Sequence, residues 1–376
     1  MAGIYIHIPF CKTKCHYCDF YKSTDFAARA DFLSALKKEM ILRKYEAGDG
    51  QIETIYFGGG TPSVLKISEI ESILQLLFSS FQVCQDPEIT LEANPDDLTV
   101  SFVRELTGSR INRLSVGIQS FNDRDLKAMN RRHNASQALD CVKNAGDAGF
   151  HNLSIDLIYG LPDQSLEDWS RNVDLAIGLN VSHISAYHLT YHKGTVFYHY
   201  LKAGKLREIP DELSFAQFRL LKQRLEQVGY EHYEISNFAR DGQYSRHNRS
   251  YWERKNYIGF GPSAHSFDLR TRRWNVSNLK KYLQGVENDE TFWKDELLSL
   301  QDQYNDYMIT SLRTMWGISD EYLEKAFDSR YSRYFRKEAQ PFIDTGYMYS
   351  DGGAYTLSEE GLFISDKIME KLFFIG

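Results

Sequence analysis

Short runs rich in β-branched and aromatic residues alternate with longer amphipathic segments through the first half of the chain. The short runs predict strands at residues 4–7, 54–57, 88–92, 113–117, 152–157 and 183–188. The intervening segments predict helices at residues 26–45, 68–80, 99–107, 135–148 and 165–178. Because parallel strands are joined by helical crossovers, this alternation predicts an α/β fold with a parallel sheet. A partly closed barrel and an open doubly wound sheet fit the pattern equally well.

The pattern changes after Gly194. Residues 211–228 predict one amphipathic helix, whereas residues 233–265 are rich in Tyr, Asn, Ser, Arg and Gly and show little periodicity. Helical patterns return beyond residue 301, an Asp-Gly-Gly hairpin signal lies at 351–353, and residues 358–372 predict a last helix. Helices combined with a hairpin predict a small α+β unit, winged-helix-like, at the carboxyl end.

Composition excludes several classes of protein. With 44 Lys and Arg against 51 Asp and Glu, the net charge is −7, so no overall basic field attracts nucleic acid, and residues 319–324 in the winged-helix-like unit are acidic. The longest apolar stretch, residues 70–81, is interrupted by polar residues and is far shorter than the roughly 20 residues that span a bilayer. No signal peptide is visible. We expect a cytoplasmic protein with at most peripheral membrane contact.

Three of the five cysteines lie within eight residues, at Cys11, Cys15 and Cys18, while Cys84 and Cys141 stand alone. Three thiolates on one loop can hold three irons of a cubane cluster and leave the fourth iron open to a small molecule. A zinc site would need a fourth ligand, which His7 or His16 could supply. A redox CxxC pair would use only two of the three cysteines. The iron–sulfur interpretation explains all three and is favoured.

The CxxxCxxC spacing, with Tyr17 before the last cysteine, resembles the radical S-adenosylmethionine (SAM) superfamily. A second motif, Gly-Gly-Gly-Thr-Pro at 58–62, directly follows the second predicted strand, where glycines allow backbone groups to approach a ligand. It is not a phosphate-binding Walker loop, because no Gly-Lys-Ser/Thr follows. The resemblance implies a partial (β/α)6 barrel of radical SAM type and a [4Fe–4S] cluster on Cys11, Cys15 and Cys18.

The resemblance also implies a set of SAM-binding residues at or just beyond the carboxyl ends of predicted strands, where ligands of such folds bind. They are Tyr5, Tyr17, Gly59, Gly60, Thr61, Glu92, Gln119, Arg131 and Asp156. SAM carries an ammonium, a carboxylate, a ribose diol and a sulfonium, so a mixture of acidic, amide and guanidinium groups suits it. Taken singly, Glu92 or Asp156 would more often be a helix cap or a structural ion pair.

Within that superfamily the whole chain resembles the oxygen-independent coproporphyrinogen III oxidases (HemN) and the related heme chaperones (HemW type). The oxidases carry a further cysteine two residues after the motif, where this chain has Phe20, and an amino-terminal extension before the first cysteine, which here is already residue 11. The sequence His-Asn-Arg-Ser-Tyr-Trp at 247–252 matches the HNxxYW motif of the chaperones. All three features favour the chaperones.

The chaperone resemblance implies that the protein binds heme, with His247 as the ligand, and delivers it to respiratory heme proteins. His265, after the Gly-rich turn at 259–264, is a second candidate for heme contact. It also implies an electron donor of flavodoxin or ferredoxin type. An enzyme that decarboxylates coproporphyrinogen III, and a radical SAM enzyme for an unrelated substrate, remain the alternatives. We expect a radical SAM core at 1–235, a connecting segment with the HNxxYW motif at 236–300, and a HemN-type carboxyl-terminal domain at 301–376.

Overall fold

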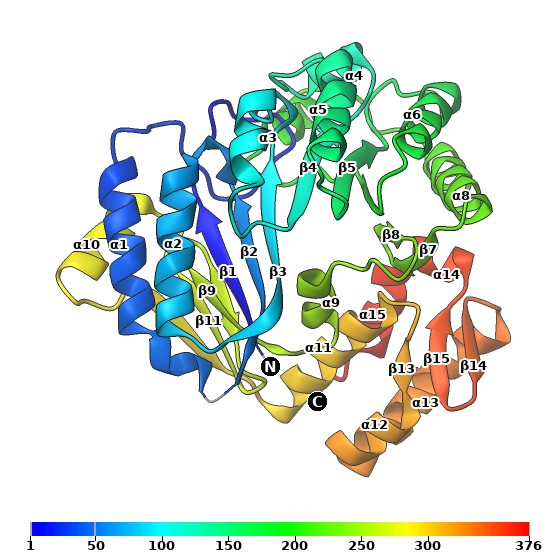
Figure 1. Cartoon of the computed structure of the whole chain (residues 1–376). Coiled ribbons are helices and arrows are strands. Elements are labelled where there is room, and N and C mark those ends of the chain that lie inside the picture. Colours follow the sequence, from blue (N-terminus) through cyan, green and yellow to red (C-terminus); the bar gives the residue numbers. More distant parts are fainter. Residues whose placement is uncertain (1, 49, 376) are drawn as a thin grey trace.

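A single large sheet organises the first three quarters of the chain (Figure 1). The computed structural model describes residues 2–48 and 50–375. At the centre of the sheet, six consecutive parallel strands are each hydrogen-bonded to the next: β1 (Ala2–Ile8), β2 (Ile52–Gly59), β3 (Val83–Ala93), β4 (Arg113–Gln119), β5 (Leu153–Tyr159) and β6 (His183–His188). All six strands were predicted from the sequence, and the parallel α/β class is confirmed.

Helices lie in each connection between these strands and beyond them. They are α1 (Arg29–Leu42), α2 (Ile67–Ser80), α3 (Val100–Leu106), α4 (Asp123–Ala128), α5 (Ala135–Asp147), α6 (Leu166–Gly178), α7 (Val196–Lys202) and α8 (Asp211–Gln227). Local signals explain several boundaries: the hydroxyl of Ser165 accepts a hydrogen bond from the backbone of Asp168 at 3.0 Å, the N-cap of α6. The predicted first helix is shorter than expected, because it ends at Leu42 and a 3₁₀ turn, Lys44–Ala47, follows.

Both edges of the parallel sheet are extended by shorter strands. These are β7 (Glu231–Glu234) and β8 (Asn237–Ala239) beside β6, and β9 (Asn256–Phe260), β10 (His265–Phe267), β11 (Thr271–Asn275) and β12 (Trp293–Leu297) beside β1. Two helices, α9 (Arg246–Trp252) and α10 (Leu279–Glu287), lie in the same stretch. The segment expected to be a connector therefore supplies five of the twelve strands of this sheet.

The two faces of the parallel strands differ in polarity. One face carries apolar residues such as Ile6, Phe57 and Leu91, which belong to the main hydrophobic core together with the crossover helices. The opposite, inner face carries polar side chains at alternate positions: Thr54, Tyr56, Glu88, Thr90, Glu92, Arg113, Ser115, Ser154, Asp156, His183 and Ser185. A polar inner face is unsuited to a packed barrel core, so it leaves the interior to ligands and to the segment that covers it.

The carboxyl-terminal unit has its own core around Tyr304, Tyr331 and Phe335. It consists of α11 (Leu300–Leu312), β13 (Ile318–Ser319), α12 (Asp320–Ala326), α13 (Ser329–Asp344), β14 (Met348–Asp351), β15 (Ala354–Leu357), α14 (Glu359–Phe363) and α15 (Ser365–Leu372). Its antiparallel sheet has the order β13-β15-β14, and the predicted hairpin turn is confirmed, with Gly352 and Gly353 both at positive φ. The predicted single helix at 358–372 is wrong, because the chain breaks it at Ile364.

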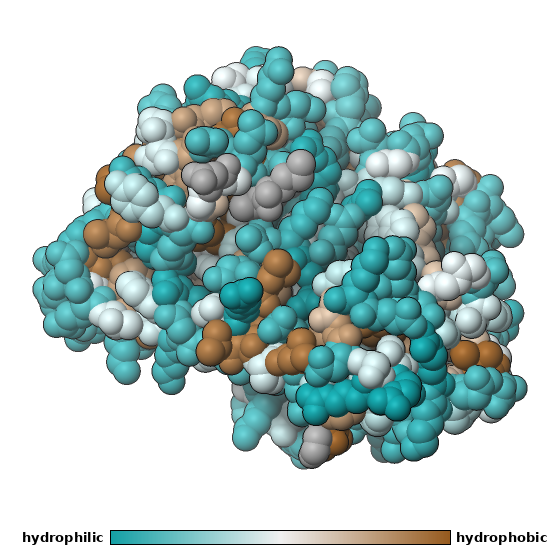
Figure 2. Space-filling view, turned by 90° about the horizontal axis from the view of Figure 1, so that it is seen from below, coloured by the Kyte–Doolittle hydropathy of each residue, from teal (hydrophilic) through white to brown (hydrophobic). Residues whose placement is uncertain are grey.

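Two ion pairs, neither of them fully buried, join the carboxyl-terminal unit to the rest of the chain. Arg313 donates to the carboxylate of Glu234 at the end of β7, and Glu359 pairs with Arg219 on α8. Figure 2, which views the molecule from the side of the amino ends of β1–β3, shows a mainly hydrophilic face with a few apolar side chains near its middle. Within the described residues, no helix has the length and hydropathy required to span a membrane.

Candidate cofactor site

The cysteine loop follows β1 and forms one wall of a cavity of about 430 Å³ at the carboxyl ends of the strands. Cys11, Cys15 and Cys18 are free thiols, and all three line this cavity. The hydroxyl of Thr61 donates to Cys11 Sγ at 3.3 Å, while burial raises the pKa of that thiol. In the folded chain, the cysteine motif therefore places three sulfur atoms on the wall of one cavity.

The glycine loop forms the next part of the wall, and its sequence is dictated by close approach. A Cβ on Gly60 would lie 2.7 Å from the carbonyl oxygen of Ile8, and one on Gly59 would lie 2.5 Å from the ring of His7. Gly59 also has a φ of +102°, which is strained for residues with a side chain. Only glycine therefore lets β1 and this loop meet beneath the cavity, and Gly59, Gly60 and Thr61 all line it.

Two carboxyl groups face the same space from β3 and β5. Burial raises the pKa of Glu92 to about 7, although the hydroxyl of Tyr56 and the amide of Gly59 donate to its carboxylate at 2.8 and 3.2 Å. Burial likewise raises the pKa of Asp156 to about 6, partly offset by hydrogen bonds from serine hydroxyls. Such groups gain most from a cationic or hydroxyl-bearing ligand, because the ligand replaces the water that they have lost.

Arg131 brings a fixed positive charge to the same cavity. Its Nη2 donates to Asn94 Oδ1 and to the carbonyl oxygen of Gly117, both at 2.5 Å, and its Nη1 lies 3.4 Å from Cys15 Sγ. The Tyr17 hydroxyl is also 3.4 Å from Nη1. The guanidinium is therefore held rigidly between the cysteine loop and the strand ends, and its Nε has no hydrogen-bond partner among the described residues.

Gln119 reaches the cavity through an unusual backbone. Its φ is +70°, in the left-handed region, and the register of β4 with β5 shifts between Gly117 and Gln119. A non-glycine residue in this region costs of order 1 kcal/mol, and such strain is typical of functional sites. Here it aims an amide side chain at the cavity from the end of β4.

The residues present fit a [4Fe–4S] cluster with SAM. The described residues contain no group of three or more side chains arranged to hold a single metal ion, but thiolates that bind separate irons of a cubane need not converge on one point. The cavity combines this thiol set with a glycine cradle, two acidic groups and a guanidinium. Cys11, Cys15 and Cys18 would hold the cluster, and the polar groups that line the same cavity would hold SAM.

Sequence reasoning missed several residues of the cavity. Asn94, which fixes Arg131, lies just after β3, and Leu189 and Thr190 follow β6. A systematic search of the residues after each predicted strand would have found them, since ligands of such sheets bind there. Tyr56 was missed for a different reason: it lies within its strand and acts by donating to Glu92.

The HNxxYW motif forms helix α9, which lies against the amino-terminal half of the inner face. The carboxylate of Glu88 on β3 accepts hydrogen bonds from the backbone amides of Arg246 and His247 at 3.1 and 3.0 Å. The ring of His247 stacks on Tyr56 at 4.9 Å between centroids, and on Tyr5 at 6.5 Å. The predicted heme motif is therefore inside the barrel, directly below the cavity that holds the cysteines.

His247 is closed off in this structure. Its side chain is 1 % exposed, Nδ1 is hydrogen-bonded to Thr54 Oγ1 and Nε2 to the hydroxyl of Tyr251, both at 2.7 Å. Burial and the nearby Arg113 lower the pKa of His247 to about 3, so the ring is neutral. Tyr5 lies in the same layer and does not line the cavity; its hydroxyl is 3.2 Å from Nδ1 of His7. His265, the second candidate, lies on β10 and stacks against Trp274.

Comparison with known proteins gives the family. Residues 5–176 match the model of the radical SAM superfamily, and residues 298–364 match that of the HemN carboxyl-terminal domain. The crystal structure of coproporphyrinogen III oxidase (HemN) from Escherichia coli superimposes with a TM-score of 0.85 over 99 % of this chain and 90 % of that one, at 24 % identity, which establishes a shared fold.

Curated relatives extend over nearly the full length. The chain is 32 % identical over 375 residues to the heme chaperone HemW of Bacillus subtilis, covering 98 % of each protein. It is 34 % identical over 286 residues to that of Mycobacterium tuberculosis, covering 75 % of this chain and 73 % of the relative. The chain therefore belongs to the HemW family of heme chaperones.

Proposed function

We propose that this protein is a cytoplasmic heme chaperone that carries a [4Fe–4S] cluster and SAM, binds heme and delivers it to heme proteins of respiration. The observation that carries the cofactor part is the single cavity on which Cys11, Cys15, Cys18, the glycine loop and two buried carboxyl groups converge. When bound, a cluster with an open iron supplies one-electron reduction to the small molecule that it coordinates.

The chain's own residues orient the ligand and exclude water. Arg131, anchored on Asn94 and Gly117, lies beside the cysteine loop and is suited to a carboxylate. Glu92 and Asp156, both with raised pKa values, are suited to the ammonium and the ribose hydroxyls. These assignments give each charged group of one zwitterionic ligand a partner of opposite charge in the same cavity.

Family membership and the HNxxYW motif support heme binding, with His247 as the proposed ligand. Because both ring nitrogens of His247 are hydrogen-bonded in the present conformation, coordination to iron requires one of these bonds to open. The bond to Tyr251 lies within one turn of α9, so a small rearrangement of this seven-residue helix would release Nε2. The heme site is thus proposed to form on binding.

The decisive experiment is a hemin titration of anaerobically reconstituted protein, followed by absorbance in the Soret region. We expect saturation at about one heme per chain for the wild type, a large loss of affinity for His247→Ala, and little change for His265→Ala. Unsaturable uptake that neither substitution alters would contradict the proposal. Loss of heme binding in His265→Ala but not in His247→Ala would identify His265 on β10 as the heme ligand.

The alternative activity is tested in the same preparation. Phe20, which stands where the oxidases have a further cysteine, is 65 % exposed at the mouth of the cavity. We expect no protoporphyrinogen after anaerobic incubation with SAM, a reductant and coproporphyrinogen III. Stoichiometric product would show that the protein is an oxidase.

A further inference from the structure

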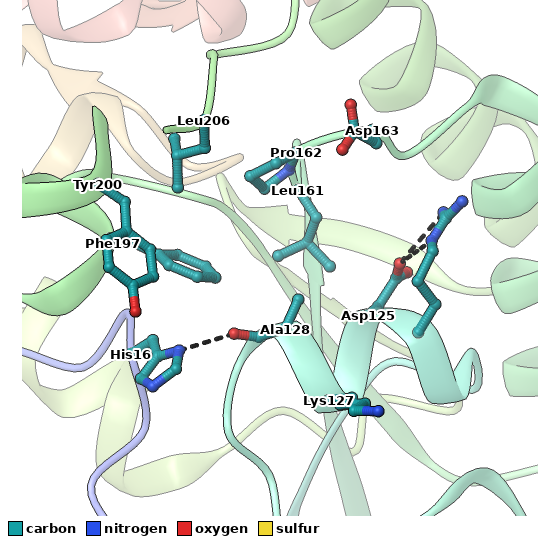
Figure 3. A pocket seen from close by; sticks show the side chains of 11 residues that line it. His16, Asp125, Lys127, Ala128, Leu161, Pro162, Asp163, Phe197, Tyr200 and Leu206 are labelled. Atoms are coloured by element: carbon teal, nitrogen blue, oxygen red, sulfur yellow. Dashed lines mark hydrogen bonds and ion pairs between the residues drawn. The ribbon is translucent and has the colours of Figure 1, made fainter. Parts of the chain in front are cut away.

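A second cavity, of about 370 Å³ (Figure 3), is lined by His16, whereas the neighbouring Cys15 and Tyr17 line the cofactor cavity. Its floor is apolar, formed by Leu161 and Pro162 after β5 and by Phe197 and Leu206 at α7 and beyond. His16, between Cys15 and Tyr17 in the sequence, forms part of its wall. None of the cavity-lining residues belongs to the proposed SAM or heme sites.

The cysteine loop is clamped at this point by the two helices that border the second cavity. His16 Nδ1 is hydrogen-bonded to the carbonyl oxygen of Ala128 at 2.8 Å, as Figure 3 shows, and the His16 amide donates to Met129 at 3.0 Å. From the other side, the amide of Phe197 donates to the carbonyl oxygen of His16 at 3.0 Å. The surface around His16 is therefore a rigid outer wall directly behind two of the three cysteines.

Three lysines surround this wall. Lys14 is held by its carbonyl oxygen to Asn130, Lys127 precedes Ala128 on α4, and Lys205 lies over the ring of Tyr200, which itself contacts His16. All three are exposed, and within residues 2–48 and 50–375 none of them forms an ion pair. The acidic Asp125 in the cavity wall is paired with Arg124, which leaves Asp163 as the exposed carboxylate among the lining residues.

This surface has the anatomy of a docking site for a protein, with an apolar centre and a charged rim. The rim is positive although the chain as a whole has a net charge of −7, so the lysines produce a local field of opposite sign to the rest of the molecule. Such a field attracts an acidic partner and orients it toward one face. Because His16 is adjacent to Cys15, a partner docked here would lie close to the cluster and could exchange electrons with it.

We infer that the surface formed by His16, Lys14, Lys127, Tyr200 and Lys205 is the docking site of an acidic one-electron carrier protein, and this inference rests on the proposed function. One electron leaves the reduced carrier and enters the oxidised cluster; no bond is formed and no proton is transferred. The carrier docks on the outer wall of the loop, so that the cofactor cavity on the inner side remains open to its own ligands. The interface of this complex is small and the complex is short-lived, as is usual for electron-transfer encounters between proteins.

The test is a binding titration with an acidic flavodoxin as the probe, followed by flavin fluorescence, on cluster-loaded protein. The variant combines Lys14→Glu, Lys127→Glu and Lys205→Glu. The control combines Lys280→Glu, Lys281→Glu and Lys294→Glu, three exposed lysines of α10 and β12 that also form no ion pair among the described residues and change the net charge equally.

At low salt we expect the docking variant to bind the probe about tenfold more weakly or worse, and the control to bind within about twofold of the wild type. About 0.5 M salt should abolish the difference, because exposed charges are then screened. The rate of cluster reduction by the reduced flavodoxin should fall in parallel, while reduction by dithionite stays unchanged in both variants.

Equal weakening in the two variants would overturn the inference, since net charge alone would then explain binding. Binding that is insensitive to salt and to the docking substitutions would also overturn it. A wild-type protein that assembles no reducible cluster would contradict the proposed function instead; the flavodoxin titration requires no reduction and, repeated on the cluster-free protein, would still decide between the two faces.

Discussion

The two halves of the barrel interior are built from the same strands but are in opposite states. At the carboxyl ends, β1–β6 open into a cavity of about 430 Å³ that is lined by the polar groups of the cofactor site. At the amino ends, helix α9 fills the interior, and both ring nitrogens of His247 are hydrogen-bonded. One half is preorganised for its ligand, whereas the other is closed upon itself.

Preorganisation and closure have different costs. A rigid cavity binds its ligand without a free-energy penalty for rearrangement. Its desolvated carboxyl groups, such as Glu92, destabilise the protein when no ligand is bound. A closed site is stable when empty, but part of the ligand's binding energy is spent on opening it. For a carrier that must also release its cargo, this second arrangement has a use, because the hydrogen bonds of α9 compete with the cargo.

The largest expected effect concerns the cysteines. Cys15→Ser should abolish cluster assembly, because the serine hydroxyl is a poor iron ligand and two thiolates do not hold a cubane. Iron content and the broad visible absorbance after anaerobic reconstitution measure this. Cys84→Ser, which alters a cysteine away from the loop, is the control and should retain full iron. An unchanged iron content in Cys15→Ser would contradict the cluster assignment, and the cavity at the carboxyl ends of the strands could then no longer be called preorganised for a cluster and SAM.

The glycine cradle should be nearly as sensitive. In Gly60→Ala the new Cβ would lie 2.7 Å from the Ile8 carbonyl oxygen, so the loop must move away from β1, and SAM affinity should fall at least tenfold, or about 1.4 kcal/mol. Equilibrium binding of SAM measures this. In Gly146→Ala the added methyl group meets nothing within 4 Å, so this helical substitution should leave affinity unchanged and raise stability slightly. Unchanged affinity in Gly60→Ala would show that SAM does not lie in this cradle.

The open half was largely predictable from the sequence and the closed half was not. The parallel strands have strong local periodicity, and the cysteine and glycine motifs follow two of them, so position along the chain almost determines position in space. Helix α9 has only seven residues, and its amino end is fixed by Glu88, 159 positions before His247. No local pattern contains that contact, which is why residues 233–265 gave no elements.

Individual residues of the site show the same division. The resemblance gave Gln119 and Arg131 as ligand-binding positions, but not the left-handed backbone of the former or the anchoring of the latter by Asn94. The resemblance also did not predict that His247 is buried, because this histidine lies in a polar stretch of sequence that is typical of a surface loop. Tertiary contacts, rather than composition, determine exposure there.

The free-energy cost of burying Glu92 in the cofactor cavity can be measured through the pH dependence of stability. Glu92, with its pKa raised from 4.5 to about 7, binds more protons in the folded protein than in the unfolded one between those values. The contribution of Glu92 to the unfolding free energy of SAM-free protein should therefore fall as pH rises through this window, by on the order of 3 kcal/mol, and level off above it, whereas buried histidines such as His247, whose pKa is lowered, contribute with the opposite sign. Denaturant titrations at several pH values measure it.

The difference in unfolding free energy between the wild type and Glu92→Gln isolates this contribution and should change by that amount across the window, while the difference for Glu105→Gln, an exposed position on α3, should stay constant. Saturating SAM should reduce the contribution of Glu92 in the wild type, because a cationic ligand stabilises the ionised carboxylate. A difference between wild type and Glu92→Gln that does not change between pH 5 and 7 would mean that the Glu92 carboxylate is already compensated in the empty protein and that the cavity is less desolvated than its geometry implies.

The smallest effect tests closure directly and has an unusual sign. Tyr251→Phe removes the hydroxyl that is hydrogen-bonded to His247 Nε2, so heme no longer competes with it, and heme affinity should increase several-fold, as expected from a net hydrogen-bond energy of about 1 kcal/mol. Tyr257→Phe is the control: Tyr257 contacts the Tyr251 ring at 4.5 Å but forms no hydrogen bond with His247 among the described residues. A Soret titration of both variants gives the comparison. Weaker binding in Tyr251→Phe would mean that the hydroxyl assists the heme rather than opposing it, and α9 would then be part of a preformed site like the cavity above it.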